Sequence, residues 1–293
     1  MGSGAARSFH KKAKVQILMH PIIFSSLGKM NQAAVISNAQ IKLIRSLRQK
    51  KFRDHYRLYL VEGEKMVAEL MENPENSRHR AIRLFATSEY LDRNKDLFHR
   101  HPTEVMEATK KELEKISNLV TPQTVLAMAS LPDALPLDQV PPDEPVLAFD
   151  SIRDPGNLGT ILRTADWFGI HHVVCSPDSA DLYNPKVVQS TMGALFRVEV
   201  IYADLPEWLS MVGKGERQIL GTFLEGTSLY EIPLKNNPVI LFGNESKGLP
   251  DHYDPYLTQK ISIPPFHRGE KGPESLNIAA SVAVICSEMR RKK

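Results

Sequence analysis

Short, uninterrupted apolar segments alternate with helical segments throughout the second half of the chain. Because these apolar segments lack alternating polar residues, they are typical of strands buried on both faces. We expect strands at Val146–Asp150, His172–Cys175, Val198–Ile201, Ile219–Phe223, Val239–Phe242 and Lys260–Ile263. We expect helices at Leu158–Phe168, Lys186–Leu195, Pro206–Val212 and Ser275–Arg291. This order predicts an α/β fold with a mostly parallel sheet and helices on both faces, whose ligands gather beyond the carboxyl ends of the strands.

A proline-rich segment separates this alternating region from the part before it. Five of the 20 prolines fall in residues 131–145, which predicts an extended linker. The preceding part reads as a small α/β unit. We expect its strands at Arg57–Val61, Ile82–Ala86 and Val125–Ala129, and its helices at Asn38–Lys51, Gly63–Met71 and Thr109–Ser117. The predicted division is a basic, flexible extension (1–35), a substrate-binding domain (36–130), the linker (131–145) and a catalytic domain (146–293).

The composition limits the class of protein. Apolar residues make up 42% of the 293 residues and charged residues 24%, as in water-soluble globular proteins. No apolar run approaches the roughly 18 residues that span a bilayer, so we expect no membrane association. No Cys/His cluster has zinc-ligand spacing, so we expect no metal. Cys175 and Cys286 lie at apolar positions and are expected to be small core residues in a reducing compartment.

The charge is unevenly distributed along the chain. Residues 1–53 contain eleven Lys/Arg and no acidic residue, whereas the rest holds 26 basic and 34 acidic residues. Such a basic end favours a polyanion partner, most simply nucleic acid, although a solvated basic tail gives the same pattern. The candidate contacts lie on or just beyond the expected helix at 38–51: Lys42, Arg45, Arg48, Lys50, Lys51 and Arg53. We expect a cytoplasmic protein, with import into mitochondria through the basic N-terminus as the alternative.

The first of three polar segments, Asp154–Ala165, leaves a strand and enters a helix. Gly156 and Gly159 permit a tight turn and a close backbone approach. Asn157 lies near the expected N-cap, and Arg163 follows six residues later. Taken alone, this segment is equally explained as an ordinary turn with a capping asparagine and an exposed arginine.

The second polar segment, Leu241–Leu249, runs from a strand directly into Gly243, Asn244 and Glu245. It lacks the G-x-G-x-x-G spacing of dinucleotide sites and the Gly-Lys-Ser/Thr ending of a P-loop. The sequence therefore disfavours NAD and ATP as ligands, while a plain turn stays open.

The third polar segment begins at Ile261–Pro265 and continues through a basic loop with His267, Arg268 and Lys271. It ends in Glu274–Ser281, where Ser275 and Asn277 precede small residues that allow close helix packing. Capping of the following helix is the simplest structural role for both polar residues.

Together, in order and spacing, these three segments resemble the motifs of the SpoU/TrmH family of RNA 2′-O-ribose methyltransferases, which belong to the SPOUT class. Residues 59–67 also resemble the family's N-terminal substrate-binding domain, which is similar to RNA-binding ribosomal proteins. The resemblance implies a trefoil-knotted catalytic domain, S-adenosylmethionine as cofactor, RNA as substrate and a homodimer. Ribosomal RNA is the favoured substrate and transfer RNA the alternative.

The resemblance also implies roles for residues at matching positions. Gly243, Ile263 and Leu276 are expected to bind the cofactor. Catalysis and ribose–phosphate positioning are expected from Arg163, Asn157, Glu245, Ser275 and Asn277. The loop Pro265–Pro273 is longer than is usual in the family, so its path and the phosphate contacts of its basic residues stay open.

The reaction needs a group that assists the weakly acidic ribose hydroxyl. Arg163 is the family's candidate, either as a neutral base or as a cation that stabilises the developing alkoxide while phosphate or Glu245 takes the proton. Two other classes stay open: a catalytically silent RNA-binding protein with the same scaffold, and a nucleotide-binding α/β enzyme acting on a small molecule.

Overall fold

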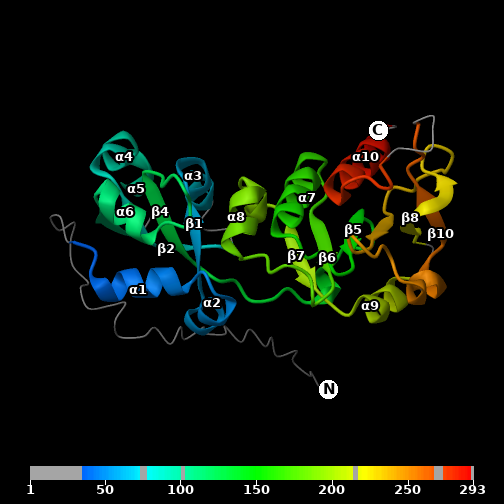
Figure 1. The fold of residues 1–293 in the computed structure, drawn as a ribbon, viewed down its shortest axis with the longest axis horizontal. Coiled ribbons are helices and arrows are strands. Elements are labelled where there is room, and N and C mark those ends of the chain that lie inside the picture. Colours follow the sequence, from blue (N-terminus) through cyan, green and yellow to red (C-terminus); the bar gives the residue numbers. More distant parts are fainter. Residues whose placement is uncertain (1–34, 73–77, 100–102, 214–216, 267–272, 292–293) are drawn as a thin grey trace, which may run out of the picture. The chain divides into compact units, whose positions relative to one another are not determined.

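The computed structural model describes residues 35–72, 78–99, 103–213, 217–266 and 273–291, which form two β-sheets with their covering helices (Figure 1). The larger sheet lies in the C-terminal half of the chain and the smaller one in the N-terminal half. No helix in these ranges is long and apolar enough to cross a bilayer.

All strand pairs of the larger sheet are parallel, as predicted. Its order is β10-β8-β9-β5-β6-β7. The strands are β5 (Val146–Phe149), β6 (His172–Cys175), β7 (Glu199–Tyr202), β8 (Ile219–Ser228), β9 (Val239–Phe242) and β10 (Gln259–Ser262). Every residue of β5 and β9 is buried, which explains why these strands read as continuous apolar runs.

Helices cover both faces of this sheet. Successive side chains of a strand point to opposite faces, so alternate residues enter two separate cores. Leu147 and Phe149 of β5 pack in the core that contains residues of α7 (Pro155–Trp167), α8 (Pro185–Thr191) and α10 (Ile278–Arg290). Val146 and Ala148 pack on the opposite face against α9 (Leu205–Val212). The predicted α/β architecture is therefore confirmed. The short 3-10 helices η3 (Ala194–Phe196) and η4 (Asp251–Tyr256) complete this half.

The smaller sheet has the order β1-β4-β2-β3. Its strands are β1 (Leu58–Glu62), β2 (Ala81–Ala86), β3 (Glu104–Glu107) and β4 (Val125–Ser130), and β4 is antiparallel to both of its neighbours. Six helices accompany it in the described residues: α1 (Asn38–Ser46), α2 (Lys50–Tyr56), α3 (Glu64–Glu72), α4 (Ser88–Arg93), α5 (Lys95–His99) and α6 (Lys110–Ile116). Side chains of this sheet enter the same apolar core as α7 and α8. Both sheets belong to one compact unit, residues 32–293. The division into a substrate-binding domain (36–130), a linker (131–145) and a catalytic domain (146–293) stays a prediction.

The single helix predicted at 38–51 is wrong, because the chain breaks into α1 and α2. Gln49 adopts an extended conformation (φ −99°, ψ 133°) between them. The guanidinium of Arg53 donates to the carbonyls of Leu47 and Arg48, both at 2.9 Å, and so satisfies acceptors that the end of α1 leaves open. The break thus depends on a side chain that folds back from α2.

The proline-rich segment contains the short helix η2 (Leu137–Gln139) and a turn and bend at residues 142–144, so it is only partly extended, and it is held in place. Leu137 and Val140 pack against the core under α9. The buried guanidinium of Arg217 donates to the carbonyls of Pro141 and Glu144. Burial is the main reason why the pKa of Arg217 is lowered.

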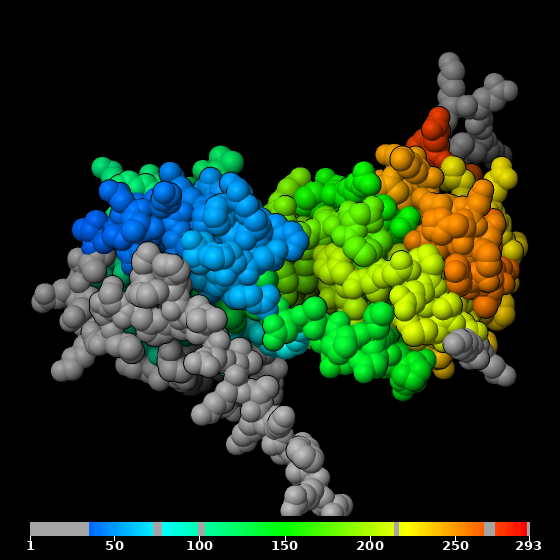
Figure 2. All heavy atoms as spheres, turned by 90° about the horizontal axis from the view of Figure 1, so that it is seen from below, coloured from blue at the N-terminus to red at the C-terminus, as the bar shows by residue number. Residues whose placement is uncertain are grey.

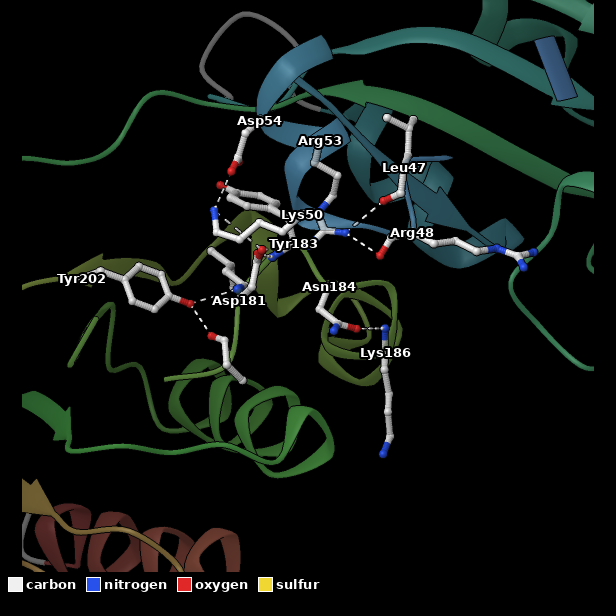
Figure 3. Close-up of polar contacts among 12 residues, drawn as sticks. Leu47, Arg48, Lys50, Arg53, Asp54, Asp181, Tyr183, Asn184, Lys186 and Tyr202 are labelled. Atoms are coloured by element: carbon white, nitrogen blue, oxygen red, sulfur yellow. Dashed lines mark hydrogen bonds and ion pairs between the residues drawn. The ribbon is translucent and has the colours of Figure 1, made fainter. Parts of the chain in front are cut away.

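A buried ion pair connects α2 to the loop between β6 and α8 (Figure 3). Arg53 Nη2 lies 2.8 Å from Asp181 Oδ2, and the Arg53 side chain is only 3% exposed. Lys50 reaches the same carboxylate at 3.9 Å from the solvent side. Arg53 is therefore not available to an RNA phosphate, and its assignment to the RNA-contacting cluster is wrong.

Candidate active site

The three polar segments meet through a chain of side-chain hydrogen bonds. Asn277, before α10, donates through Nδ2 to Asn157 Oδ1 at 3.1 Å. Asn157, on α7, donates in turn through Nδ2 to Glu245 Oε1 at 3.2 Å, in the loop after β9. The two bonds bring together residue pairs that are separated by 120 and by 88 positions in the sequence, as the resemblance implied.

Asn157 is free to make these contacts because another residue caps α7. The helix begins at Pro155, three residues earlier than predicted, and Asp154 is the N-cap. The Asp154 carboxylate accepts the backbone N–H of Asn157 at 2.8 Å. Asn157 therefore lies near the N-cap, as expected, but it is not the capping residue: it stands in the first turn with its amide directed to Glu245. An N-cap Asp before Pro and Gly is a recognised helix start, so the sequence carried the signal that we missed.

Asn277 has the capping role considered from sequence and also contacts the first segment. It is the N-cap of α10, because its Oδ1 accepts the backbone N–H of Ala279 at 2.9 Å. Its Nδ2 makes the bond to Asn157. The predicted helix start at Ser275 is wrong by three residues, since Ser275 and Leu276 precede the cap. Ser275 is exposed, and no hydrogen bond of its side chain is present among the described residues.

Glu245 is held by donors from the first polar segment and from its own loop. Its carboxylate accepts the Asp154 backbone N–H at 3.3 Å and the Asn244 Nδ2–H at 3.2 Å, besides the Asn157 amide. Asn244, which the sequence reasoning did not assign, also donates to the Ser151 carbonyl at 2.8 Å. Its Oδ1 accepts the backbone N–H of Ser246 at 3.0 Å, which shapes the loop. Nothing in the sequence distinguished Asn244 from an ordinary turn residue.

Arg163 is exposed on α7, six residues after Asn157 and about 9 Å further along the helix axis. Within the described part of the chain its guanidinium has no hydrogen bond or ion pair. Thr160 and Thr164 on the same helix bond back to the carbonyls of Gly156 and Thr160 at 2.8 and 2.9 Å, so their hydroxyls do not engage it. Arg163 thus presents an unengaged fork of donors, suited to a phosphate or a developing alkoxide.

Gly243 closes the loop after β9. A Cβ at this position would lie 2.1 Å from the Gly248 carbonyl carbon and 2.2 Å from the Leu249 nitrogen. Asn244 and Gly248 exchange backbone hydrogen bonds of 3.0 and 2.9 Å across the same turn. A Cβ here would therefore collide with the protein's own backbone, whatever the cofactor requires.

We expect Gly243→Ala to destabilise the fold by about 2–4 kcal/mol, because backbone atoms must move to admit the methyl group. Thermal or urea unfolding measures this loss. As a control, Gly248→Ala introduces a Cβ with nothing within 4 Å but at φ +69°, so it carries backbone strain alone. A Gly243→Ala protein as stable as the Gly248→Ala protein contradicts the packing argument.

Gly159 serves helix packing rather than the predicted tight turn. It lies inside α7, where a Cβ would stand 2.5 Å from Ser190 Oγ and 3.0 Å from the Val187 carbonyl of α8. The absence of a side chain brings α7 and α8 together and so holds the helix that carries Asn157 and Arg163.

The two other predicted cofactor residues flank the third segment. Ile263 follows β10 directly and packs partly against the main core, whereas Leu276 is 50% exposed beside Asn277. His267, Arg268 and Lys271 of the lengthened loop lie outside the described residues. The cofactor roles of Gly243, Ile263 and Leu276 stay predictions.

Neither cysteine is suited to nucleophilic chemistry. Cys175 and Cys286 are buried, and burial raises the pKa of each thiol to about 12. The prediction that both are core residues is confirmed. In the described ranges, no group of three or more His, Cys, Asp or Glu residues is arranged to hold a metal ion.

Comparison with known proteins now identifies the family. Residues 144–287 match the SpoU rRNA Methylase family, and residues 38–127 match the MRM3-like substrate binding domain. A solved TrmH-family structure from Porphyromonas gingivalis is 36% identical, with a TM-score of 0.77 over 89% of this chain and 100% of that one. The chain belongs to the SpoU/TrmH family. The resemblance read from the three segments is thereby confirmed.

Two further relatives add functional information about SpoU/TrmH proteins. The 23S rRNA (guanosine(2553)-2′-O)-methyltransferase RlmP of Bacillus subtilis is 27% identical over 89% of this chain and 100% of its own. The AdoMet-bound rRNA methyltransferase structure from Sinorhizobium meliloti is also 27% identical, with a TM-score of 0.76 and coverage of 89% and 99%.

Proposed function

We propose that this protein transfers a methyl group from S-adenosylmethionine to a ribose 2′-hydroxyl of ribosomal RNA. The observation that carries the proposal is the hydrogen-bonded chain Asn277–Asn157–Glu245, with the unengaged Arg163 on the same helix as Asn157. The related RlmP acts on 23S rRNA at a 2′-O position, and the related Sinorhizobium enzyme binds AdoMet. These features favour an active enzyme over a silent RNA-binding scaffold.

The residues present fit the cofactor. The half-exposed Leu276 and the partly buried Ile263 offer apolar surface to the cofactor. Bound S-adenosylmethionine supplies an electrophilic methyl group on a sulfonium, so the protein's task lies with the ribose. We assign to Arg163 the cationic role: it orients the target phosphate and stabilises charge that develops on the 2′-oxygen. Glu245, held by three donors, is the carboxylate that takes the proton, directly or through the substrate.

Calorimetry tests the cofactor assignment. S-adenosylmethionine is expected to bind equally well with and without a chelator, because the proposed site uses no metal. Loss of binding on chelation, or no binding at all, contradicts this assignment.

The N-terminal part is proposed to supply RNA affinity, as the match to an MRM3-like substrate binding domain suggests. Its basic surface is smaller than the sequence implied. Besides the buried Arg53, two arginines donate to backbone carbonyls: Arg45 to Lys115 at 2.6 Å and Arg48 to Ser117 at 2.7 Å. Residues 35–56 (blue in Figure 2) form part of the outer surface, where Lys42 and Lys51 are exposed. These two lysines are the cations best placed for phosphate.

Further proposals rest on family likeness. They are a homodimer that pairs through α10 and a trefoil knot in the segment from β8 to α10. A location in the cytoplasm is proposed separately, because two free cysteines fit a reducing compartment. Light scattering and localisation of the tagged protein address the first and last of these. A mitochondrial location is the alternative outcome, given the basic first 53 residues.

A further inference from the structure

Ser151, three residues before the first polar segment, has an unusual backbone conformation. Its φ is +55°, one of three positive values for non-glycine residues in the described part of the chain. This left-handed region disfavours residues with a Cβ, so surrounding contacts must hold Ser151 there.

Each polar group of Ser151 is held by a different neighbour. Its N–H donates to Ser176 Oγ at 2.7 Å, and its hydroxyl donates to Asp178 Oδ2 at 2.6 Å. Its carbonyl accepts from Asn244 Nδ2 at 2.8 Å. Ser151 thereby connects the loop after β6 with the loop after β9, where Asn244 also contacts Glu245.

Asp178 is the centre of this arrangement. Its Oδ1 accepts the Ser176 hydroxyl at 2.7 Å, while Oδ2 accepts the Ser151 hydroxyl and lies 3.4 Å from Arg153 Nη2. The hydrogen bonds from Ser151 and Ser176 lower the pKa of Asp178, so the carboxylate is ionised at neutral pH and acts only as an acceptor. Ser176 relays the contact, since its hydroxyl accepts from Ser151 and donates to Asp178.

The loop that carries Ser176 and Asp178 is itself anchored at several points. Ala180 donates its N–H to the Ile152 carbonyl at 2.7 Å, next to Ser151. Tyr202 of β7 donates its hydroxyl to the Ala180 carbonyl at 2.6 Å and accepts the Leu182 N–H at 2.9 Å (Figure 3). Asp181 is held by Arg53. Ser151 and Ile152 are therefore fastened to a loop that cannot shift without breaking several bonds.

We propose that Ser151, Ser176 and Asp178 form a positioning frame that sets the first polar segment against Asn244 and Glu245. The frame acts through the catalytic residues and touches neither substrate nor cofactor. Its bonds hold the backbone immediately before Asp154, which caps α7 and donates to Glu245. The placement of Asn157 relative to Glu245 thus depends on the conformation of Ser151. This inference rests on the proposed methyl transfer.

Ser151→Gly separates positioning from stability. Glycine adopts φ +55° without strain and keeps the backbone bonds to Ser176 and Asn244, so the fold is retained. The variant loses only the side-chain bond to Asp178, and with it one restraint on this backbone conformation. The single-turnover rate of methyl transfer, at saturating RNA and S-adenosylmethionine, is expected to fall about 10- to 100-fold, because small misplacements of reacting groups lower rates by this much. Asp178→Ala is expected to give a similar loss. In both variants the dissociation constants for cofactor and RNA should stay within about twofold of the parent, because the frame contacts neither ligand.

Ser210→Ala is the matched control. Its hydroxyl also makes one bond, to the Glu207 carbonyl at 2.7 Å, but on α9 against the opposite face of the sheet. Its rate should equal that of the parent. Rates within twofold of the parent in both Ser151→Gly and Asp178→Ala overturn the proposed frame. A loss of rate that is accompanied by weakened RNA binding or by a lowered melting temperature also overturns it. An inactive parent protein instead overturns the proposed function, so the two failures are distinguishable.

Discussion

Replacing Arg163 with alanine is expected to lower single-turnover methyl transfer at least about 100-fold, because a preorganised donor to developing negative charge is lost. Binding of S-adenosylmethionine should stay within about twofold, since Arg163 lies on α7 and not in the segments assigned to the cofactor. Stability should change little, because the side chain is exposed and has no ion pair in the described part of the chain. Single-turnover kinetics, calorimetry and thermal unfolding measure the three quantities.

Arg163→Lys distinguishes the possible roles of this residue. A cation that only neutralises charge is replaced well by lysine, whereas a planar fork that binds phosphate and alkoxide together is not. We expect Arg163→Lys to recover only a small part of the lost rate. Near-normal turnover of the alanine protein would remove Arg163 from the mechanism.

Replacing Arg53 with alanine is expected to cost about 3 kcal/mol of unfolding free energy, as breaking a buried ion pair from one side does. The change leaves Asp181 with only the more distant Lys50, and removes the donor from the carbonyls of Leu47 and Arg48. Urea unfolding measures the loss, with the midpoint shifting at an unchanged slope.

Lys50→Ala is the matched control for this ion pair. Lys50 is 65% exposed and reaches the same carboxylate from 3.9 Å, so its removal should cost less than about 1 kcal/mol. An Arg53→Ala protein that loses no more than the Lys50→Ala protein contradicts a structural role for the buried pair.

The sequence predicted the larger sheet well because its strands carry their own signal. Strands buried on both faces appear as apolar runs, and β6 and β9 coincide with the predicted segments. The prediction failed where distant residues decide local structure. The end of α1 depends on Arg53, which is held by a carboxylate 128 residues away. The strand β3 was missed because none of its residues is buried, and α4 and α5 are too short for a clear periodicity.

The candidate site was predictable in its residues but not in its contacts. The order of three segments identified Asn157, Glu245 and Asn277, and the structure joins them. The bond partners of Asn244 and the conformation of Ser151 arise only when the loops after β5, β6 and β9 meet. The crowding around Gly243 was likewise not visible in the sequence, because it depends on the path that its own loop takes.

Analysis of the methylated product tests the central claim most directly. The protein is incubated with ribosomal RNA from cells that lack it and with S-adenosylmethionine labelled in its methyl group, and the RNA is digested to nucleosides. We predict label in a single 2′-O-methylnucleoside, and none when the Arg163→Ala protein is used. Label on a base, label only in transfer RNA offered in parallel, or no transfer at all would contradict the account.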